Sequence, residues 1–304
     1  MLYAINRAAR AIYRLFKDTT LGYVQCNGSM LAAALSYQMI FSLSPLLILV
    51  TSAAGMVFSE VSVIDRLVLE ISHTVSPRAA QAVQSLLEAG QVSSSPGVYT
   101  TISLGLMLFF ASMVFARMKK AINLMWEITS QPGQGMLLFV RTHTLSFLMV
   151  MVVVSLFLTF LVVSTTLVSI NQWLSINTGV GEPFLARADI GLTYVGFTLL
   201  FAIIFKTLPD AQVAWDDTLI GAAFTSTLFT AGEFLIGIYL GRISLRGIYG
   251  AMGSLIIVLA WVFYSMQIVL YGAKFTQVYA NRYGKKVVPS KKAARVVPSL
   301  EIYE

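Results

Sequence analysis

The stretch LSFLMVMVVVSLFLTFLVV, residues 145–163, contains no charged side chain. It lies inside a longer apolar block that runs from residue 139 to residue 170. The hydrocarbon core of a bilayer is about 30 Å thick, and a helix needs about 20 apolar residues to cross it. Because hydrocarbon offers no water to peptide groups, a crossing segment satisfies its backbone hydrogen bonds as a helix. This block therefore predicts a transmembrane helix.

Five further apolar blocks of spanning length lie on either side of this one. They cover residues 30–58, 98–116, 190–208, 218–240 and 248–278. The chain as a whole is 57% hydrophobic and 12% charged, whereas soluble domains carry about 25% charged residues. We therefore expect an all-α fold, a polytopic transmembrane helical bundle of six spans over residues 30–280.

Three other segments are too polar to cross a bilayer. Residues 1–29 place four basic side chains on one face of a helix and apolar side chains on another, which predicts an amphipathic helix. This helix lies either on an anionic leaflet or on the protein's own cytosolic face. Residues 59–97 keep helical spacing and are net acidic, which predicts a helical extracytoplasmic cap. Residues 281–304 form a basic cytoplasmic tail.

The distribution of Lys and Arg predicts the orientation of the spans, since these residues concentrate in short cytoplasmic loops. Of the 21 Lys and Arg residues, 16 fall on the proposed inner side of the membrane. The outer side has the other five, Arg66, Arg78, Arg187, Arg242 and Arg246. Both termini are therefore expected in the cytoplasm. Membrane orientation also explains the net charge of +7, and we expect no nucleic-acid partner.

Ionisable side chains inside the predicted spans are candidates for a substrate pathway, because each costs at least about 2.5 kcal/mol on insertion scales. Glu233 in the fifth span is the strongest candidate. The alternative is a structural ion pair or a position near the outer interface. Lys206 and Lys274 lie near the cytosolic ends of their spans, where long side chains can reach water.

Uncharged polar groups add further pathway candidates. Gln38 and Gln267 either line a pathway or join helices by hydrogen bonds. Pro45 removes a backbone hydrogen bond from the first span and predicts a kink there. Ser42 is close enough in sequence to help satisfy the backbone groups that this kink leaves free.

The residues needed for catalysis are scarce. His73 and His143 are the only histidines, and the predicted topology puts them on opposite sides of the bilayer. The single cysteine excludes an intramolecular disulfide, and no HExxH, GxSxG, Walker or CxxC motif occurs. Asp210, Asp216 and Asp217 form an acidic cluster without enough evident ligands for a metal, and Asp216 and Asp217 suit the first turn of the fifth helix. We expect no enzyme activity, no metal and no cofactor.

Several stretches spread over the chain resemble one known family. They are Ala32-Ala33-Ala34-Leu35-Ser36-Tyr37, Phe41-Ser42-Leu43-Ser44-Pro45-Leu46, Ala121-Ile122-Asn123 with Trp126, Leu208-Pro209-Asp210, Ile238-Tyr239-Leu240-Gly241, Tyr249-Gly250-Ala251-Met252-Gly253-Ser254 with Trp261, and Phe275-Thr276-Gln277-Val278-Tyr279-Ala280. On these residues the chain resembles the YihY/BrkB membrane proteins of bacteria, which include the virulence factor BrkB and were formerly labelled ribonuclease BN. The resemblance implies six spans, the bacterial inner membrane, and a link to envelope integrity and serum resistance.

Two positions depart from the family pattern. Glu233 stands where we expect Lys, and Lys274 stands where we expect Glu. Counting from the predicted outer turn at about 1.5 Å per residue, their depths differ by roughly 30 Å, so they should not pair. We expect Lys274 to pair with Asp210 or Asp217, and Glu233 with an arginine of residues 242–246.

The same features support three functional hypotheses. A broken first helix, polar groups at membrane depth and an amphipathic cap favour a transporter or flippase of an envelope lipid or other amphiphile. A non-catalytic envelope-assembly or structural protein explains these features as helix packing. A membrane-bound hydrolase, after the ribonuclease label, is the third hypothesis. The expected partners are membrane lipids and further copies of the chain in a homo-oligomer.

Overall fold

The computed structural model describes residues 2–39, 98–130, 182–242, 253–290 and 293–295, with short helical pieces between residues 64 and 85 and between 148 and 166. Its long helices are α1 (Leu2–Gln25), α5 (Val98–Met125), α7 (Glu182–Thr207), α8 (Trp215–Arg242) and α10 (Gly253–Tyr283). Residues 28–39 are also helical. The predominantly helical structure agrees with the predicted all-α class. Most of the predicted cap and much of the predicted first and third spans lie outside the described residues.

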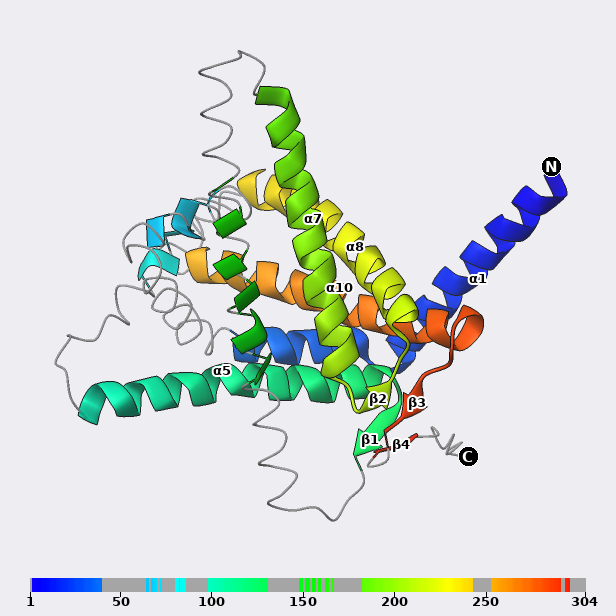
Figure 1. Ribbon diagram of the computed structural model, residues 1–304, viewed down its shortest axis with the longest axis horizontal. Helices are drawn as coiled ribbons and strands as arrows, with labels where there is room; N and C mark the ends of the chain where they lie inside the picture. Colours follow the sequence, from blue (N-terminus) through cyan, green and yellow to red (C-terminus); the bar gives the residue numbers. More distant parts are fainter. Residues whose placement is uncertain are drawn as a thin grey trace.

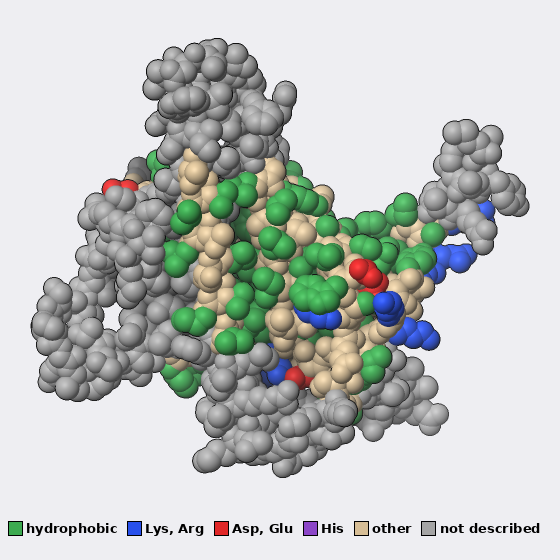
Figure 2. Space-filling model, in the orientation of Figure 1, with side chains coloured by type: hydrophobic (Ala, Val, Ile, Leu, Met, Phe, Trp, Pro, Cys, Tyr) green, Lys and Arg blue, Asp and Glu red, His purple; other side chains and the backbone are tan. Residues whose placement is uncertain are grey.

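Helix α10 is the central element of the described bundle. It contacts α1, α5 and α8, while α8 also contacts α7 (Figure 1). Within the described residues, one helical stretch, Ile256–Tyr283 of α10, is long and apolar enough to cross a membrane. A shorter apolar helix, Gly191–Thr207, lies in α7. Figure 2 shows hydrophobic side chains spread over the face formed by α7 and α8, and Lys and Arg side chains gathered near α1 and the end of α10.

Helices α8 and α10 pack closely through two reciprocal pairs of glycine and threonine. Gly221 faces Thr276, and Gly272 faces Thr225, so that a Cβ atom at either glycine would overlap the opposing hydroxyl. Both threonines are fully buried. Thr225 donates to the carbonyl of Gly221 at 2.7 Å and Thr276 to that of Gly272 at 2.8 Å, so each hydroxyl is satisfied within its own helix.

The register in which α8 packs on α10 also determines how far apart Glu233 and Lys274 lie, the two positions that depart from the family pattern. Gly232, next to Glu233, lies against Tyr264 of α10. Tyr264 precedes Lys274 by ten residues, which is about 15 Å along a helix. Glu233 and Lys274 are thus separated along the helix axis and do not pair, but the predicted distance of roughly 30 Å was wrong, because Gly232 lies level with Tyr264 rather than with a residue nearer the start of α10.

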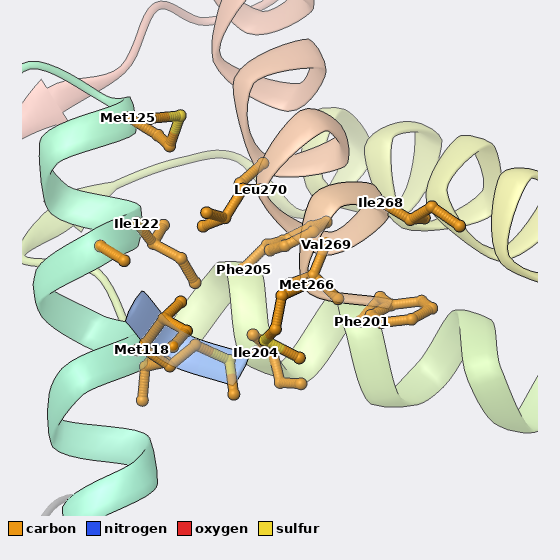
Figure 3. Close-up of a cluster of buried hydrophobic side chains, with 14 of the residues drawn as sticks. Met118, Ile122, Met125, Phe201, Ile204, Phe205, Met266, Ile268, Val269 and Leu270 are labelled. Atoms are coloured by element: carbon orange, nitrogen blue, oxygen red, sulfur yellow. The ribbon is translucent and has the colours of Figure 1, made fainter. Parts of the chain in front are cut away.

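A cluster of buried apolar side chains joins α5, α7 and α10. Figure 3 shows side chains from these three helices converging on one another. The cluster includes Met118, Ile122 and Met125 of α5, Phe201, Ile204 and Phe205 of α7, and Met266, Val269 and Leu270 of α10. Because α5 contributes buried residues as far as Met125, the helix continues well past residue 116, where we expected the second span to end. Arg117 and Lys120 lie on the exposed side of this extension.

The predicted amphipathic helix is confirmed as α1, and it packs on the protein's own α10. Leu15, Thr19 and Tyr23 are buried in this contact. Thr20 and Tyr271 of α10 share a hydrogen bond of 3.0 Å. The N-terminal half of α1 extends away from the bundle (Figure 1).

The expected acidic first turn of the fifth span is also confirmed, since Asp216 and Asp217 lie in the first turn of α8.

Four short strands close the end of the bundle where α5 and α7 finish. Strand β1 (Ile128–Ser130) pairs antiparallel with β4 (Ala293–Arg295), and β2 (Ala211–Gln212) pairs antiparallel with β3 (Val288–Pro289). The chain after α10 is thus tied both to the turn after α5 and to the loop between α7 and α8. The basic tail that we expected over residues 281–304 begins as part of the folded structure.

Candidate functional site

The C-terminal end of α5 is held by side chains of α10. The last carbonyl groups of any helix lack amide partners inside the helix. Here the ammonium group of Lys274 donates to the carbonyl of Met125 at 2.8 Å, and Gln277 donates to the carbonyl of Trp126 at 2.6 Å. The indole N–H of Trp126 donates back to the carbonyl of Ala273 at 2.7 Å. A cation at this position also interacts favourably with the helix dipole.

Lys274 forms an ion pair with Glu127, the second residue after α5. Nζ lies 2.8 Å from Oε1, and the side chains of Lys274 and Glu127 are 3% and 38% exposed. Glu127 has a φ of 59°, in the left-handed region that favours glycine and costs other residues about 1–2 kcal/mol. This conformation is common just after a helix end. A glutamate there supplies the carboxylate that Lys274 needs.

The structure corrects two expectations about Lys274. Its side chain is buried rather than extended to water, and its partner is Glu127 rather than Asp210 or Asp217. Both differences follow from the longer α5, which brings the turn at Glu127 against α10. Asp217 instead accepts the backbone N–H of Lys285 at 2.9 Å.

Asp210 belongs to a second polar contact, between α5 and the loop after α7. Its carboxylate lies 2.8 Å from the ammonium of Lys119 and accepts a hydrogen bond of 3.0 Å from the amide of Asn123. The backbone N–H of Asp210 donates to Asn123 at 2.9 Å, which makes the Asn123 contact reciprocal. The carbonyl of Asp210 accepts from the N–H of Ser290 at 3.0 Å. One aspartate thus connects α5, the α7–α8 loop and the chain after α10.

A polar cleft of about 540 Å³ lies between α1, α10 and the turn at Glu127. Its volume is within the usual range for small-molecule sites. The α10 wall carries Lys274 and Arg282, while the facing side carries Asp18 of α1 and Glu127. Arg282 and Asp18 form an ion pair of 2.6 Å with side chains 31% and 50% exposed. An ion pair with a buried lysine and a partly exposed glutamate therefore lies at one end of the cleft, and an exposed ion pair lies at the other.

Gly22 allows Lys274 to reach the turn after α5. A Cβ atom at this position of α1 would overlap the Lys274 side chain. Gly22 and Lys274 both line the cleft. The glycine therefore positions α1 directly over the aliphatic stem of the lysine.

A comparison of the sequence with known families identifies the chain. The model of the family described as virulence factor BrkB matches residues 20–297. The chain belongs to the virulence factor BrkB family. The resemblance to YihY/BrkB proteins is thereby confirmed.

Curated relatives of this BrkB-family chain are named membrane proteins. The UPF0761 membrane protein of Alkalilimnicola ehrlichii is 29% identical over 255 residues, which cover 82% of this chain and 54% of the relative. That of Pseudomonas aeruginosa is 25% identical over 244 residues, covering 80% of this chain and 57% of the relative. The chain thus spans little more than half the length of these relatives. No solved structure matches the chain.

The predicted pathway residues that the structure describes do not gather at one place in this BrkB-family chain. Lys274 lines the cleft. Lys206 donates to the carbonyl of Val213 and lies 5.2 Å from the ring of Trp215, so it braces the α7–α8 loop. Gln267 accepts hydrogen bonds from the hydroxyls of Tyr23 and Ser29. Gln267 thus makes hydrogen bonds between helices, one of the two roles expected for it.

The other predicted pathway residues are remote from the cleft or outside the described part. Gln38 is half-buried at the end of the helical residues 28–39 and does not line the cleft. Ser42 and Pro45 lie outside the described residues. Glu233 belongs to α8, but its side chain lies outside the described part. Within the described residues, no group of three or more His, Cys, Asp or Glu side chains is arranged to hold a metal.

Sequence reasoning missed most residues of the cleft. Glu127, Asp18 and Arg282 carried no pattern that distinguishes them from ordinary surface charges. Trp126 and Gln277 were signalled indirectly, because both lie in the stretches on which the family resemblance rests.

Cys26, the single cysteine, lies close to the ion pair of Lys274 and Glu127. Cys26 is half-buried, and its sulfur lies 3.9 Å from the ammonium of Lys274. Burial raises the pKa of the Cys26 thiol, the charge of Lys274 lowers it and the charge of Glu127 raises it further. Only the thiolate reacts with alkylating agents. The thiol is therefore less reactive at neutral pH than an ordinary cysteine.

We expect substitutions in the ion pair to shift this reactivity in opposite directions. Glu127→Gln removes a charge that raises the pKa of Cys26, so alkylation at pH 8 should become faster. Lys274→Met removes a charge that lowers this pKa, so alkylation should become slower. Rates of iodoacetamide labelling from pH 7 to 10 measure both effects. A cysteine at exposed position 29 in a Cys26→Ser background is the control, and equal shifts at both cysteines would contradict the assignment.

Proposed function

We propose that this BrkB-family protein crosses the bacterial inner membrane six times, with both termini in the cytoplasm and a helical cap over residues 59–97 on the outer side. The names of the relatives support a membrane location. So do the apolar α10 and the exposed apolar side chains of α7 and α8, which include Val195, Leu199 and Leu235. Lipid is the solvent that such a surface requires.

Cysteine labelling tests this topology. Ser94→Cys and Ser299→Cys, each in a Cys26→Ser background, should react with a membrane-impermeant maleimide from opposite sides of the membrane. Position 94 should label from the outside of intact spheroplasts, and position 299 only after lysis. Labelling of both positions from one side contradicts the proposed arrangement.

We further propose that the protein binds and moves an envelope lipid or another amphiphile across the membrane, without enzymatic turnover. The observation that carries this proposal is a polar cleft lined by ion pairs at the end of an apolar helical bundle. An amphiphile has a polar head that suits the cleft and an apolar tail that suits the flank of the bundle. Leu21, half-exposed at the cleft, offers apolar surface next to the charged groups.

A non-catalytic structural role in the envelope is the second candidate. The contacts that hold the end of α5 favour it, because Lys274 and Gln277 each satisfy a helix-terminal carbonyl. In this reading the buried ion pair serves packing alone, and the protein has no substrate to move.

Reconstitution separates the two candidates. Proteoliposomes with a fluorescent phospholipid in both leaflets are treated with dithionite, which quenches only the outer leaflet. Transport predicts a second quenching phase that protein-free vesicles lack. Glu233→Gln should slow this phase, and Asp216→Asn, an exposed carboxylate of the same helix, should leave it unchanged. Folded protein that adds no second phase for any envelope lipid would favour the structural role.

A further inference from the structure

The positive and negative side chains of the cleft come from opposite walls. Both cations, Lys274 and Arg282, come from α10, and they lie eight residues apart, which is about 12 Å along the helix. Both carboxylates come from facing elements, Asp18 from α1 and Glu127 from the turn after α5. The cleft is therefore neutral as a whole, but it has a positive side and a negative side.

The neutrality of the cleft restricts the charge of its ligand. A simple anion that binds to the cations would leave a carboxylate without its partner, and a simple cation would leave Lys274 or Arg282 alone. A bound ligand covers the charge that it leaves unpaired and removes water from it, which is unfavourable. A ligand that carries one charge of each sign can exchange partners with an ion pair, so that every charge keeps a partner.

The two ion pairs differ in how readily they open. The pair of Lys274 and Glu127 has a nearly inaccessible cation, and the lysine also binds the carbonyl of Met125. The pair of Asp18 and Arg282 is exposed on both sides, and exposed pairs contribute little to stability. The ligand therefore exchanges with Asp18 and Arg282, while Lys274 and Glu127 remain closed as the inner end of the cleft.

We propose that the cleft binds a zwitterionic head group, with an anionic phosphate or carboxylate at Arg282 and an ammonium group at Asp18. The planar guanidinium of Arg282 suits two oxygens of one phosphate or carboxylate group. The lipid source of this head group rests on the proposed function, whereas the preference for a zwitterion rests on the charges of the cleft.

Binding of three soluble probes tests the charge preference. The purified 304-residue chain in detergent is titrated calorimetrically with glycerophosphoethanolamine, glycerol phosphate or ethanolamine at constant ionic strength. The zwitterion should bind at least about tenfold more tightly than either single charge. Equal binding of glycerol phosphate, or no binding of any probe, would overturn the proposal.

Two variants and two matched controls locate the site. Arg282→Gln and Asp18→Asn should each weaken zwitterion binding by about tenfold, which is the loss of one charged contact. Both side chains are substantially exposed, so the variants should fold, and an unchanged thermal midpoint verifies this. Lys285→Gln and Asp216→Asn change exposed charges outside the cleft and should bind like the parent protein. Equal losses in the controls would overturn the assignment.

Nanodiscs distinguish the source of the head group. Phosphatidylethanolamine that protects a Leu21→Cys thiol in a Cys26→Ser background from alkylation, when phosphatidylglycerol does not, supports a lipid ligand, because position 21 lines the cleft. If glycerophosphoethanolamine binds but phosphatidylethanolamine gives no protection, the cleft is a zwitterion site whose ligand is a soluble molecule rather than a lipid. Because the flipping measurement is independent, a failure of transport is distinguishable from a failure of the charge preference.

Discussion

Glu127→Gln should lower the free energy of unfolding by about 3 kcal/mol, although the glutamate is itself partly exposed. The loss is large because the substitution leaves the ammonium of Lys274, only 3% exposed, without a carboxylate. Removing one partner of a buried ion pair typically costs about 3–5 kcal/mol. The hydrogen bond from Lys274 to the carbonyl of Met125 remains, which places the effect at the lower end of this range.

Replacing the lysine of this pair should lower the free energy of unfolding by less than replacing the glutamate. Lys274→Met, at about 2 kcal/mol, leaves the carbonyl of Met125 without its donor. The carboxylate of Glu127 is 38% exposed and regains water. The double variant should lose less than the sum of the single losses, because no buried charge is left alone.

Denaturant titration of the three variants in detergent micelles measures this coupling. Asp18→Asn is the control, because it removes a carboxylate from an exposed ion pair and should cost at most about 1 kcal/mol. Additive losses for Lys274 and Glu127 would show that the two side chains do not act as a pair in the folded protein.

The helices of this protein were predictable because their signal is local. Long apolar blocks identified the positions of α5, α7, α8 and α10, and the carboxylates Asp216 and Asp217 indicated where α8 begins. The continuation of α5 to Met125 was not predicted, because Arg117 and Lys120 resemble the end of a span. A helix that leaves hydrocarbon can continue when one face stays buried, as the α5 face with Met118, Ile122 and Met125 does.

The cleft was not predictable in the same way, because its contacts are distant in sequence. Lys274 and Glu127 are 147 residues apart, and only the packing of α5 on α10 brings them together. Glu127 also has a left-handed backbone conformation, which the presence of a glutamate in the sequence does not predict. Only the family resemblance indicated the region, since Asn123, Trp126 and Gln277 all lie within its stretches.

Trp126→Ala should produce the largest loss of stability, about 4 kcal/mol. The side chain is fully buried and is among the largest in the core. Truncating a buried aromatic residue to alanine typically costs about 3–5 kcal/mol. The substitution also removes the indole donor from the carbonyl of Ala273.

Trp126→Phe separates ring volume from hydrogen bonding. It keeps most of the apolar volume but loses the indole N–H, so the expected loss is about 1–2 kcal/mol. Trp215→Ala is the matched control, since this tryptophan is exposed and contacts Lys206 through its ring, a contact of about 0.5–1 kcal/mol. Equal losses at both tryptophans in a denaturant titration would contradict the buried role of Trp126.

Combining Trp126→Ala with Lys274→Met tests whether α10 holds the end of α5 as one unit. Trp126 and Lys274 act on neighbouring groups, the carbonyl of Ala273 and the carbonyl of Met125. Residues that share one network couple by about 0.5–3 kcal/mol. If the first substitution already releases the end of α5, the second has less left to break, and the combined loss falls below the sum. A strictly additive result would mean that each contact holds α5 separately, so the inner end of the cleft would survive the loss of either contact.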